Sequence, residues 1–335
     1  MSNGPLILGL QSKGRLAEQT HDFLAASGLP ITGGQGREYT GRIAGLDAVE
    51  IVFLQSSEIP TQLEAGNINL GITGEDLLRE KTLDMDACMA LLKPLGFGRA
   101  DLVVAAPRTW IDVRNMDDMN EVCTDFHRRH GRRLRVATKY LSLTRAFFAG
   151  HGISDYRIVE SLGATEGAPN SGAAEAIVDI TSTGSTLTAN HLKILDDGLI
   201  LRSQACLAAS LTARWSDTAR AALRQILDMM QGRSRANEFK LVQFASSGSK
   251  SLARTVAALE QEMGCTVQLD GAGGSLHCPA ASLYAVMTQL RDAGCSHVSV
   301  AQLEYIFEPQ NLLYDDFITR LNSQQRNEIN NKTGR

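Results

Sequence analysis

Short apolar runs that alternate with amphipathic segments constrain the fold of this chain more than any other feature of its sequence. Two segments with the apolar spacing of helices, residues 14–28 and 58–66, each end at a glycine, which commonly terminates a helix. Runs with the length and composition of buried strands flank them, at residues 6–10, 48–54, 68–74 and 101–107. This alternation predicts an α/β domain with a largely parallel sheet.

A second unit of the same kind follows a polar helical segment. Its predicted elements are a strand, a helix and two more strands, at residues 133–140, 142–152, 156–161 and 176–180. Ser142 is the expected N-cap of the helix. Asp179 would close the last strand and stand at its carboxyl end, which is where open α/β sheets bind ligands.

The pattern changes after Asn237, where single helices no longer separate single strands. The order becomes strand, helix, strand, strand, helix, strand, with the elements at residues 239–245, 249–264, 265–269, 273–278, 279–294 and 296–307. This βαββαβ order predicts a ferredoxin-like domain. The final residues, 321–335, are polar, and we expect them to form a flexible tail.

Charge and composition exclude several classes of function. The formal net charge is -4, and no apolar run is long enough to span a membrane, so we expect neither a nucleic-acid nor a membrane partner. The basic run at residues 126–135 lacks interleaved aromatic residues, which favours a solvated surface. The six cysteines form no CxxC pair and the seven histidines no HExxH pattern, so we predict no protein-built metal site. The start of the chain lacks a cationic signal segment, which favours a cytoplasmic location.

The stretch EAIVDITSTGSTLTAN, residues 175–190, combines an acid with a string of small hydroxyl residues around Gly184. Backbone N–H groups and hydroxyls of such a turn can surround a phosphate, and a glycine lets the backbone approach it closely. A carboxylate just upstream, at Asp179, can accept hydrogen bonds from sugar hydroxyls, so the combination suggests a sugar phosphate. A turn in which Ser and Thr serve only as helix caps fits the spacing equally well.

Two further stretches favour the phosphate interpretation. Lys13 and Arg15 lie in QSKGRLAEQT, between a strand end and a helix start, and Gly74 and Asp76 follow another strand end in NLGITGEDLL. Together KGRL, EIP with GITGxD, ATKYxxLTR and VDITSTGSTLTAN resemble the ATP phosphoribosyltransferase family, the first enzyme of histidine biosynthesis. The resemblance covers about residues 6–210, and the βαββαβ unit resembles the third domain of the family's long form.

This resemblance implies two periplasmic-binding-protein-like α/β domains plus a C-terminal ferredoxin-like domain. Residues 1–99 and 190–235 would form catalytic domain I, residues 100–189 catalytic domain II, and residues 236–320 a regulatory domain. It also implies a homo-oligomer, with a hexamer favoured, and histidine as a candidate effector.

The family joins N1 of ATP to the anomeric carbon of phosphoribosyl pyrophosphate and releases pyrophosphate, with Mg²⁺. By resemblance, Asp179 would hold the ribose hydroxyls, with Glu166 nearby, and Arg15 would complete the catalytic set. Arg15, Gly74 and Asp76 would lie on the ATP side, and Lys13 and Arg37 would face the polyphosphates. The 5′-phosphate would contact Thr181, Ser182, Thr183, Gly184, Ser185, Thr186 and Leu187.

The chain departs from the family where long-form members often carry Arg and Lys before the DIP motif. Here the stretch is LQSSEIP, with Gln55, Ser56 and Ser57. The alternative is therefore a non-catalytic or regulatory ligand-binding relative that keeps the phosphate loop. A third interpretation is the solute-binding protein of a transporter, which shares the two-domain fold but normally carries a signal segment.

Overall fold

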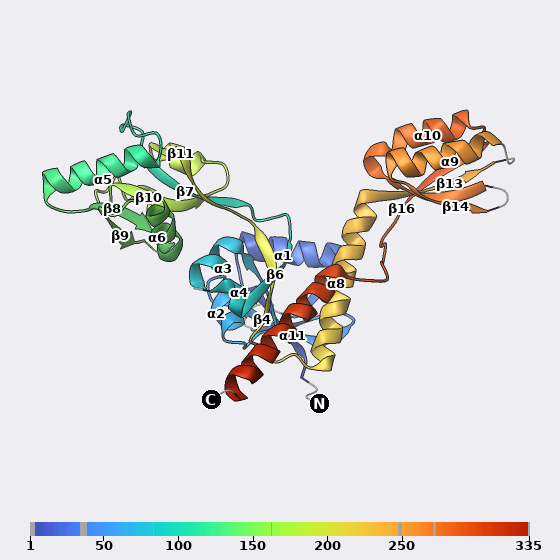
Figure 1. The fold of residues 1–335 in the computed structure, drawn as a ribbon, viewed down its shortest axis with the longest axis horizontal. Coiled ribbons are helices and arrows are strands. Elements are labelled where there is room, and N and C mark those ends of the chain that lie inside the picture. Colours follow the sequence, from blue (N-terminus) through green and yellow to red (C-terminus); the bar gives the residue numbers. More distant parts are fainter. Residues whose placement is uncertain are drawn as a thin grey trace.

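The computed structural model describes residues 4–33, 39–82, 84–161, 163–246, 250–270 and 273–333. These residues form two α/β lobes and a third, smaller unit, each built on its own sheet (Figure 1). The strand orders are β2-β3-β4-β1-β5-β12-β6 in the first lobe, β11-β7-β10-β8-β9 in the second and β14-β15-β13-β16 in the third unit.

The first lobe contains the buried strands that the apolar runs predict. Its strands are β1 (Leu6–Gln11), β2 (Ile31–Gly33), β3 (Thr40–Ile43), β4 (Leu46–Leu54), β5 (Leu70–Gly74), β6 (Met89–Pro94) and β12 (Ala205–Ser210). Its helices are α1 (Arg15–Ala26), α2 (Ile59–Glu64), α3 (Glu75–Lys81), α4 (Met85–Cys88) and α8 (Asp217–Glu238).

The second lobe is smaller and is built in the same way. Its strands are β7 (Ala100–Pro107), β8 (Leu134–Thr138), β9 (Tyr156–Glu160), β10 (Ala176–Thr181) and β11 (Leu192–Ser203). Its helices are α5 (Met116–His130), α6 (Leu141–Gly150), α7 (Ser185–Ala189) and the 3₁₀ turn η1 (Thr165–Gly167).

In each lobe, the strand that directly follows a crossing of the chain runs antiparallel to both of its neighbours. β12 pairs antiparallel with β5 and β6 in the first lobe, and β7 pairs antiparallel with β10 and β11 in the second. The chain crosses between the lobes after β6 and returns after β11. The orders β4-β1-β5-β12-β6 and β9-β8-β10-β7-β11 therefore match position by position. This confirms the periplasmic-binding-protein-like pair of domains.

The structure differs from the expected division of the chain at the second crossing. Residues 190–203 were expected in domain I, but β11 pairs with β7 from Leu192 opposite Pro107 to Ser203 opposite Ala100. Leu192 and Leu195 are buried within the second lobe, which fixes the strand there. The return to the first lobe therefore comes at Gln204.

The third unit has the ferredoxin-like arrangement that the sequence predicts. Its elements are β13 (Phe239–Ala245), α9 (Lys250–Met263), β14 (Thr266–Asp270), β15 (Gly273–Pro279), η2 (Ala280–Ser282), α10 (Leu283–Asp292) and β16 (His297–Gln302). Both helices lie on one face of the sheet (Figure 1). β16 ends five residues before the predicted position, because the following segment leaves the sheet and runs along α8, where the Ile306 N–H donates to the Gly232 carbonyl at 3.0 Å.

The C-terminal segment also differs from the expected flexible tail, because α11 (Leu312–Thr333) returns to the first lobe (Figure 1). Phe317 and Leu321 are buried in the core of that lobe, and the Phe317 ring meets Trp215 edge-on at 5.0 Å. The polar composition of this segment suggested disorder, but the segment forms a helix that a few buried apolar residues hold against the first lobe.

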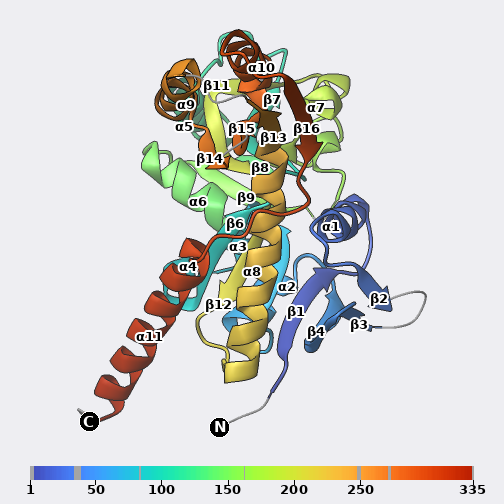
Figure 2. The same ribbon diagram turned by 90° about the vertical axis from the view of Figure 1, so that its right-hand side faces the viewer.

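Helix α8 connects the first lobe to the third unit (Figure 2). It begins at Ser216, whose hydroxyl accepts from the Ala219 N–H at 3.0 Å, and it leads directly into β13. Its 22 residues correspond to a length of about 33 Å. Among the described helices, none has the length and apolar character needed to cross a membrane.

Candidate functional site

The carboxyl ends of β1 and β5 in the first lobe, and of β8 and β10 in the second, carry the polar residues singled out from the sequence. Parallel strands bring their carboxyl ends to one edge of a sheet, and that edge is the usual ligand site of open α/β sheets. The two edges meet where the chain crosses between the lobes.

The loop after β1 presents two cations. Helix α1 begins at Arg15, preceded by Gly14 with a φ of 93° that favours glycine. Lys13 and Arg15 are exposed, and neither has an ion pair or a hydrogen bond to another residue of the described ranges. Next to them is a cavity of about 460 Å³ lined by residues that include Gln11, Ser12, His21 and Phe53. Arg37 lies outside the described residues.

Asp179 lies within β10 rather than closing it, because the strand continues to Thr181. Its Oδ1 accepts from the Ile180 N–H at 2.8 Å. Burial raises the pKa of the Asp179 carboxyl, the Ile180 N–H and the charge of Lys139 oppose this rise, and Glu166 adds to it. The charges of Glu166 and Lys139 thus both act on the Asp179 carboxyl.

The loop after β10 is shaped by its own hydroxyls. Thr181 Oγ1 accepts from the Gly184 N–H at 2.8 Å, and the hydroxyls of Thr183 and Ser185 lie 2.9 Å apart. The backbone N–H groups of Thr186 and Leu187 donate to no other group in the described part of the chain. Exposed hydroxyls and free N–H groups thus gather on one short turn, with Ser182, Thr183, Ser185 and Thr186 all exposed.

The backbone and the core explain two residues of this loop. Gly184 has a φ of 73°, a left-handed conformation that favours glycine, and a Cβ added there would meet no protein atom within 4 Å. The Leu187 side chain is buried in the second lobe, because it anchors α7 to the sheet. Only its backbone N–H faces a possible ligand.

Asp76 differs from the other candidate residues because its carboxylate is already occupied. Its Oδ1 accepts from Ser203 Oγ at 2.7 Å and its Oδ2 from the Tyr140 hydroxyl at 2.6 Å. A Cβ at Gly74 would lie 2.3 Å from Asp76 Oδ1, so this glycine makes room for the carboxylate. Burial and the neighbouring Asp76 raise the pKa of Tyr140, which keeps its hydroxyl as a donor. A direct contact of Asp76 with ATP does not fit this geometry.

The structure adds cations that the sequence interpretation missed. Arg99 and Arg202 line a cavity of about 400 Å³ at the crossing of the lobes, together with Thr181 and Ser182 from the start of the loop. Within the described ranges, neither arginine forms an ion pair or hydrogen bond, and the same holds for Lys139. Arg202 was missed because β11 was not predicted as a strand. Its pairing, with Arg202 opposite Asp101 and Ser203 opposite Ala100, is what brings it to the loop.

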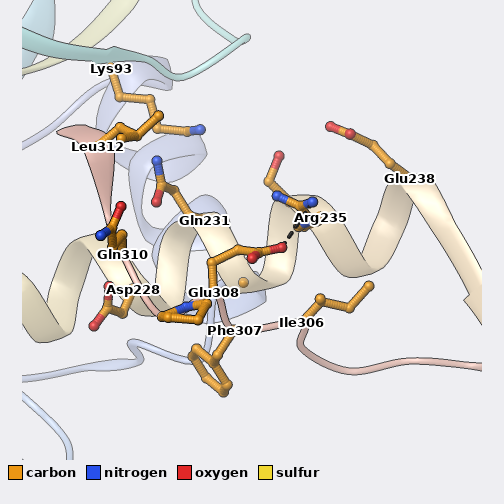
Figure 3. A pocket seen from close by; sticks show the side chains of 13 residues that line it. Lys93, Asp228, Gln231, Arg235, Glu238, Ile306, Phe307, Glu308, Gln310 and Leu312 are labelled. Carbon is orange, nitrogen blue, oxygen red and sulfur yellow. Dashed lines mark ion pairs between the residues drawn. The ribbon is translucent and has the colours of Figure 1, made fainter. Parts of the chain in front are cut away.

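A larger cavity, of about 650 Å³, lies elsewhere. Its side chains come from one face of α8 and from residues 306–312, with Lys93 of β6 beside them (Figure 3). Arg235 and Glu308 form an ion pair of 2.8 Å within it. This cavity belongs to the connection between the first lobe and the third unit, and not to the strand ends.

The fold and the site together define a class: a two-lobed α/β protein in which the chain crosses twice between the lobes and whose common edge gathers hydroxyls and cations suited to phosphate groups. Comparison with known proteins narrows this class. A family model described as HisG, ATP phosphoribosyltransferase, matches residues 55–232.

Named relatives extend this match over nearly the whole chain. The chain is 52% identical over 315 residues to the ATP phosphoribosyltransferase of Rhodopseudomonas palustris (strain BisB18), covering 92% of this chain and 96% of that one. It is 50% identical over 317 residues to that of Bradyrhizobium diazoefficiens, covering 93% and 97%. A solved ATP phosphoribosyl transferase (HisG:HisZ) complex from Thermotoga maritima aligns with a TM-score of 0.52 and 25% identity, over 68% of this chain and 96% of that one. The chain belongs to the ATP phosphoribosyltransferase family, and its match along the full length corresponds to the long form.

Proposed function

We propose that this chain joins ATP to phosphoribosyl pyrophosphate, the first step of histidine biosynthesis, at the edge where its two lobes meet. The observation that carries the site is the Asp179 carboxyl on β10, directly followed by the hydroxyl-rich loop 181–187. Both lie at one strand end. The carboxyl group can bind the hydroxyls of a ribose 5-phosphate, and the loop can bind its phosphate.

The chemistry needs positioning and charge rather than a strong base. N1 of adenine already has a lone pair, so no residue has to deprotonate it. Its attack on the anomeric carbon develops positive charge there, and a fixed carboxylate nearby stabilises that charge. Asp179 supplies the carboxylate and orients the ribose hydroxyls, and Glu166 supplies a second one.

The 5′-phosphate occupies loop 181–187 in this proposal. The exposed hydroxyls of Ser182, Thr183, Ser185 and Thr186 and the free N–H groups of Thr186 and Leu187 are its hydrogen-bond donors. Gly184 keeps the left-handed turn that aims these donors in one direction.

The polyphosphate groups need cations, and the stretch with Gln55, Ser56 and Ser57 supplies none. Arg99 and Arg202 lie at the lobe crossing beside the loop and are free to bind the leaving pyrophosphate. Lys13 and Arg15 serve the ATP phosphates from the first lobe, and Arg37 is proposed to assist them. In this proposal, cations from other elements thus take the place of the Arg and Lys that long-form members often carry before the DIP motif.

Magnesium fits these residues. Mg²⁺ prefers oxygen ligands and is held in proteins by one or two carboxylates together with substrate phosphates and water. Pyrophosphate, hydroxyls and water would be its main ligands here, and it would neutralise the charge of the leaving group.

The third unit is proposed as the regulatory module for histidine, and the intact chain as a homo-oligomer, with a hexamer favoured. The support is a complete ferredoxin-like unit that joins the first lobe through α8 and through residues 303–311, which lead from β16 to α11 (Figure 2). Sedimentation at working concentration checks the assembly, and a monomer there contradicts it.

The test of function is pyrophosphate release on mixing ATP, phosphoribosyl pyrophosphate and Mg²⁺, with each omitted in turn. Steady release that requires all three, and that histidine slows, is the expected result. A non-catalytic relative would bind either substrate in calorimetry and release no pyrophosphate, which would overturn the proposal.

A further inference from the structure

Helix α3 carries two buried acidic residues, although charged side chains are rarely buried unless they have partners. Asp76 and Glu80 stand one helical turn apart, on one face of the helix, with exposed fractions of 7% and 8%. Between them, Leu77 packs against the hydrophobic core of the second lobe. One face of this first-lobe helix therefore contacts the second lobe.

Glu80 holds the beginning of a helix in that lobe. Its carboxylate accepts from the Ser142 N–H at 3.0 and 3.1 Å and from the Leu143 N–H at 3.0 Å. These are free N–H groups in the first turn of α6, where a negative charge also interacts favourably with the helix dipole. Ser142 was expected to cap α6, but the N-cap position is Tyr140, which makes no side-chain cap bond. Glu80 therefore supplies the cap from the opposite lobe.

Asp76 adds a second connection next to the proposed reaction site. It binds Tyr140, the residue that precedes α6, and Ser203, the last residue before the chain returns to the first lobe. Tyr140 directly follows Lys139, whose charge acts on Asp179. The same two acids that join the lobes thus also fix the residues beside the proposed catalytic carboxylate.

We propose that Glu80 is a positioning residue that latches the two lobes in the arrangement required for transfer. The latch is Asp76 and Glu80 of α3 against Tyr140, Ser142 and Leu143 at the start of α6. When it is closed, the cation loop after β1 and the phosphate loop after β10 face a common site. Without it, substrate binding must also bring the lobes together, which lowers the apparent affinity for both substrates. This inference rests on the proposed function.

Three variants test the latch. Glu80→Gln keeps the side-chain length but loses the charge, and Glu80→Asp keeps the charge but withdraws it by one methylene. Glu75→Gln is the matched control, since Glu75 lies on the same helix and its carboxylate pairs with Arg79 of that helix at 2.7 Å. We expect Glu80→Gln to raise the KM of both substrates roughly ten- to a hundredfold, Glu80→Asp to raise them less, and Glu75→Gln to leave them unchanged.

Amide hydrogen exchange gives an independent reading of the same contact. In Glu80→Gln the Ser142 and Leu143 amides should exchange faster, and small-angle scattering should show a larger radius of gyration. A folded Glu80→Gln protein with parental KM values and parental exchange at both amides, even with a lower melting temperature, would overturn the latch.

Two outcomes are separated in advance. If the Glu80 variants do not fold, amide exchange is measured on the unmutated protein with and without both substrates. The latch requires that the two substrates together slow exchange at Ser142 and Leu143, and unchanged exchange contradicts it. Should the parent release no pyrophosphate, the proposed function fails, while amide exchange and scattering of parent and variants still decide whether Glu80 joins the lobes.

Discussion

The latch and the phosphate loop use polar groups in opposite ways. In the latch, buried acids meet donors of the protein itself, with Glu80 accepting from two backbone N–H groups and Asp76 from two hydroxyls. At the loop, the hydroxyls are exposed and bond only to one another or to the loop backbone, and the Thr186 and Leu187 N–H groups and the side chains of Arg99 and Arg202 have no partner in the described part of the chain. Buried polar groups must be satisfied internally, whereas exposed convergent groups remain available to a ligand. In this molecule, the charged groups that bond to other protein groups fix the arrangement of the lobes. The charged groups without such partners mark the proposed substrate site.

The strongest test of this comparison is Asp179, which shares features of both regions. Asp179→Asn keeps the shape but removes the charge near the anomeric carbon. We expect turnover to fall by about 10²–10³, the loss typical of one preorganised electrostatic contact. Steady-state kinetics measure it, and parental turnover in a folded variant would contradict the assignment.

The same variant has a stability effect of opposite sign. Burial raises the pKa of Asp179 in the folded state, so its ionisation costs stability, with the full cost present above the raised pKa and none below the unfolded value of 3.8. Asp179→Asn should therefore melt above the parent at pH 7, with a difference that shrinks as the pH falls through the raised pKa. If the residue only supported the turn, the variant would instead melt lower with parental kinetics.

Arg202 tests the exposed cations. Arg202→Gln should weaken the binding of phosphoribosyl pyrophosphate by roughly ten- to a hundredfold, since charge-assisted hydrogen bonds to phosphate contribute about 1.5–3 kcal/mol. Titration calorimetry measures this change. Arg129→Gln is the control, because Arg129 lies on the exposed basic run and faces Asp125 at 3.5 Å. Equal affinities of the two variants would remove Arg202 from the site.

Glu175 tests the partnered side without touching the latch. Its carboxylate takes hydrogen bonds from the backbone and guanidinium of Arg135, both at 2.7 Å, and from Arg132 at 3.1 Å. Burial alone would raise its pKa, but these bonds overcome that effect and lower it to about 2.

Glu175→Gln should therefore lose about 1–2 kcal/mol of unfolding free energy at pH 7, with kinetic constants unchanged. The contribution of a carboxyl with a lowered pKa is complete above its unfolded value of 4.5 and is lost as the pH falls toward about 2. Urea unfolding across that range measures it. A change in KM without a change in stability would break the comparison.

Thr186 gives the smallest expected effect. Thr186→Val removes one loop hydroxyl and should raise the KM of phosphoribosyl pyrophosphate about three- to tenfold, while the KM of ATP stays the same. Thr188→Val is the control, since the Thr188 hydroxyl accepts from Arg108 at 3.4 Å and Thr188 lies two residues further along the same helix, on a different side of it. Similar behaviour of both variants would favour a capping role for the hydroxyls.

Most of the two sheets could be predicted because their central strands are uninterrupted apolar runs. β11 could not, because Asp196, Asp197 and Gly198 interrupt its pattern and the strand is bulged there. The helix α11 was missed because a few buried residues, among them Phe317, hold an otherwise polar segment. The loop after β10 is local in sequence and was predictable. The latch was not, because it joins Glu80 to Ser142 across 62 residues.

The double crossing of the chain also sets the order in which the lobes can form during synthesis. β6 has a single neighbour in its sheet, β12, and β12 begins only at Ala205. A growing chain can therefore complete the second lobe, which is continuous from Ala100 to Ser203, before the first lobe has its last two strands in place. Until then, the edge of β5 and all of β6 lack partners and could pair with other chains. The first lobe, whose N-terminal strands are synthesised first, is therefore the last part of the two-lobed body to be completed.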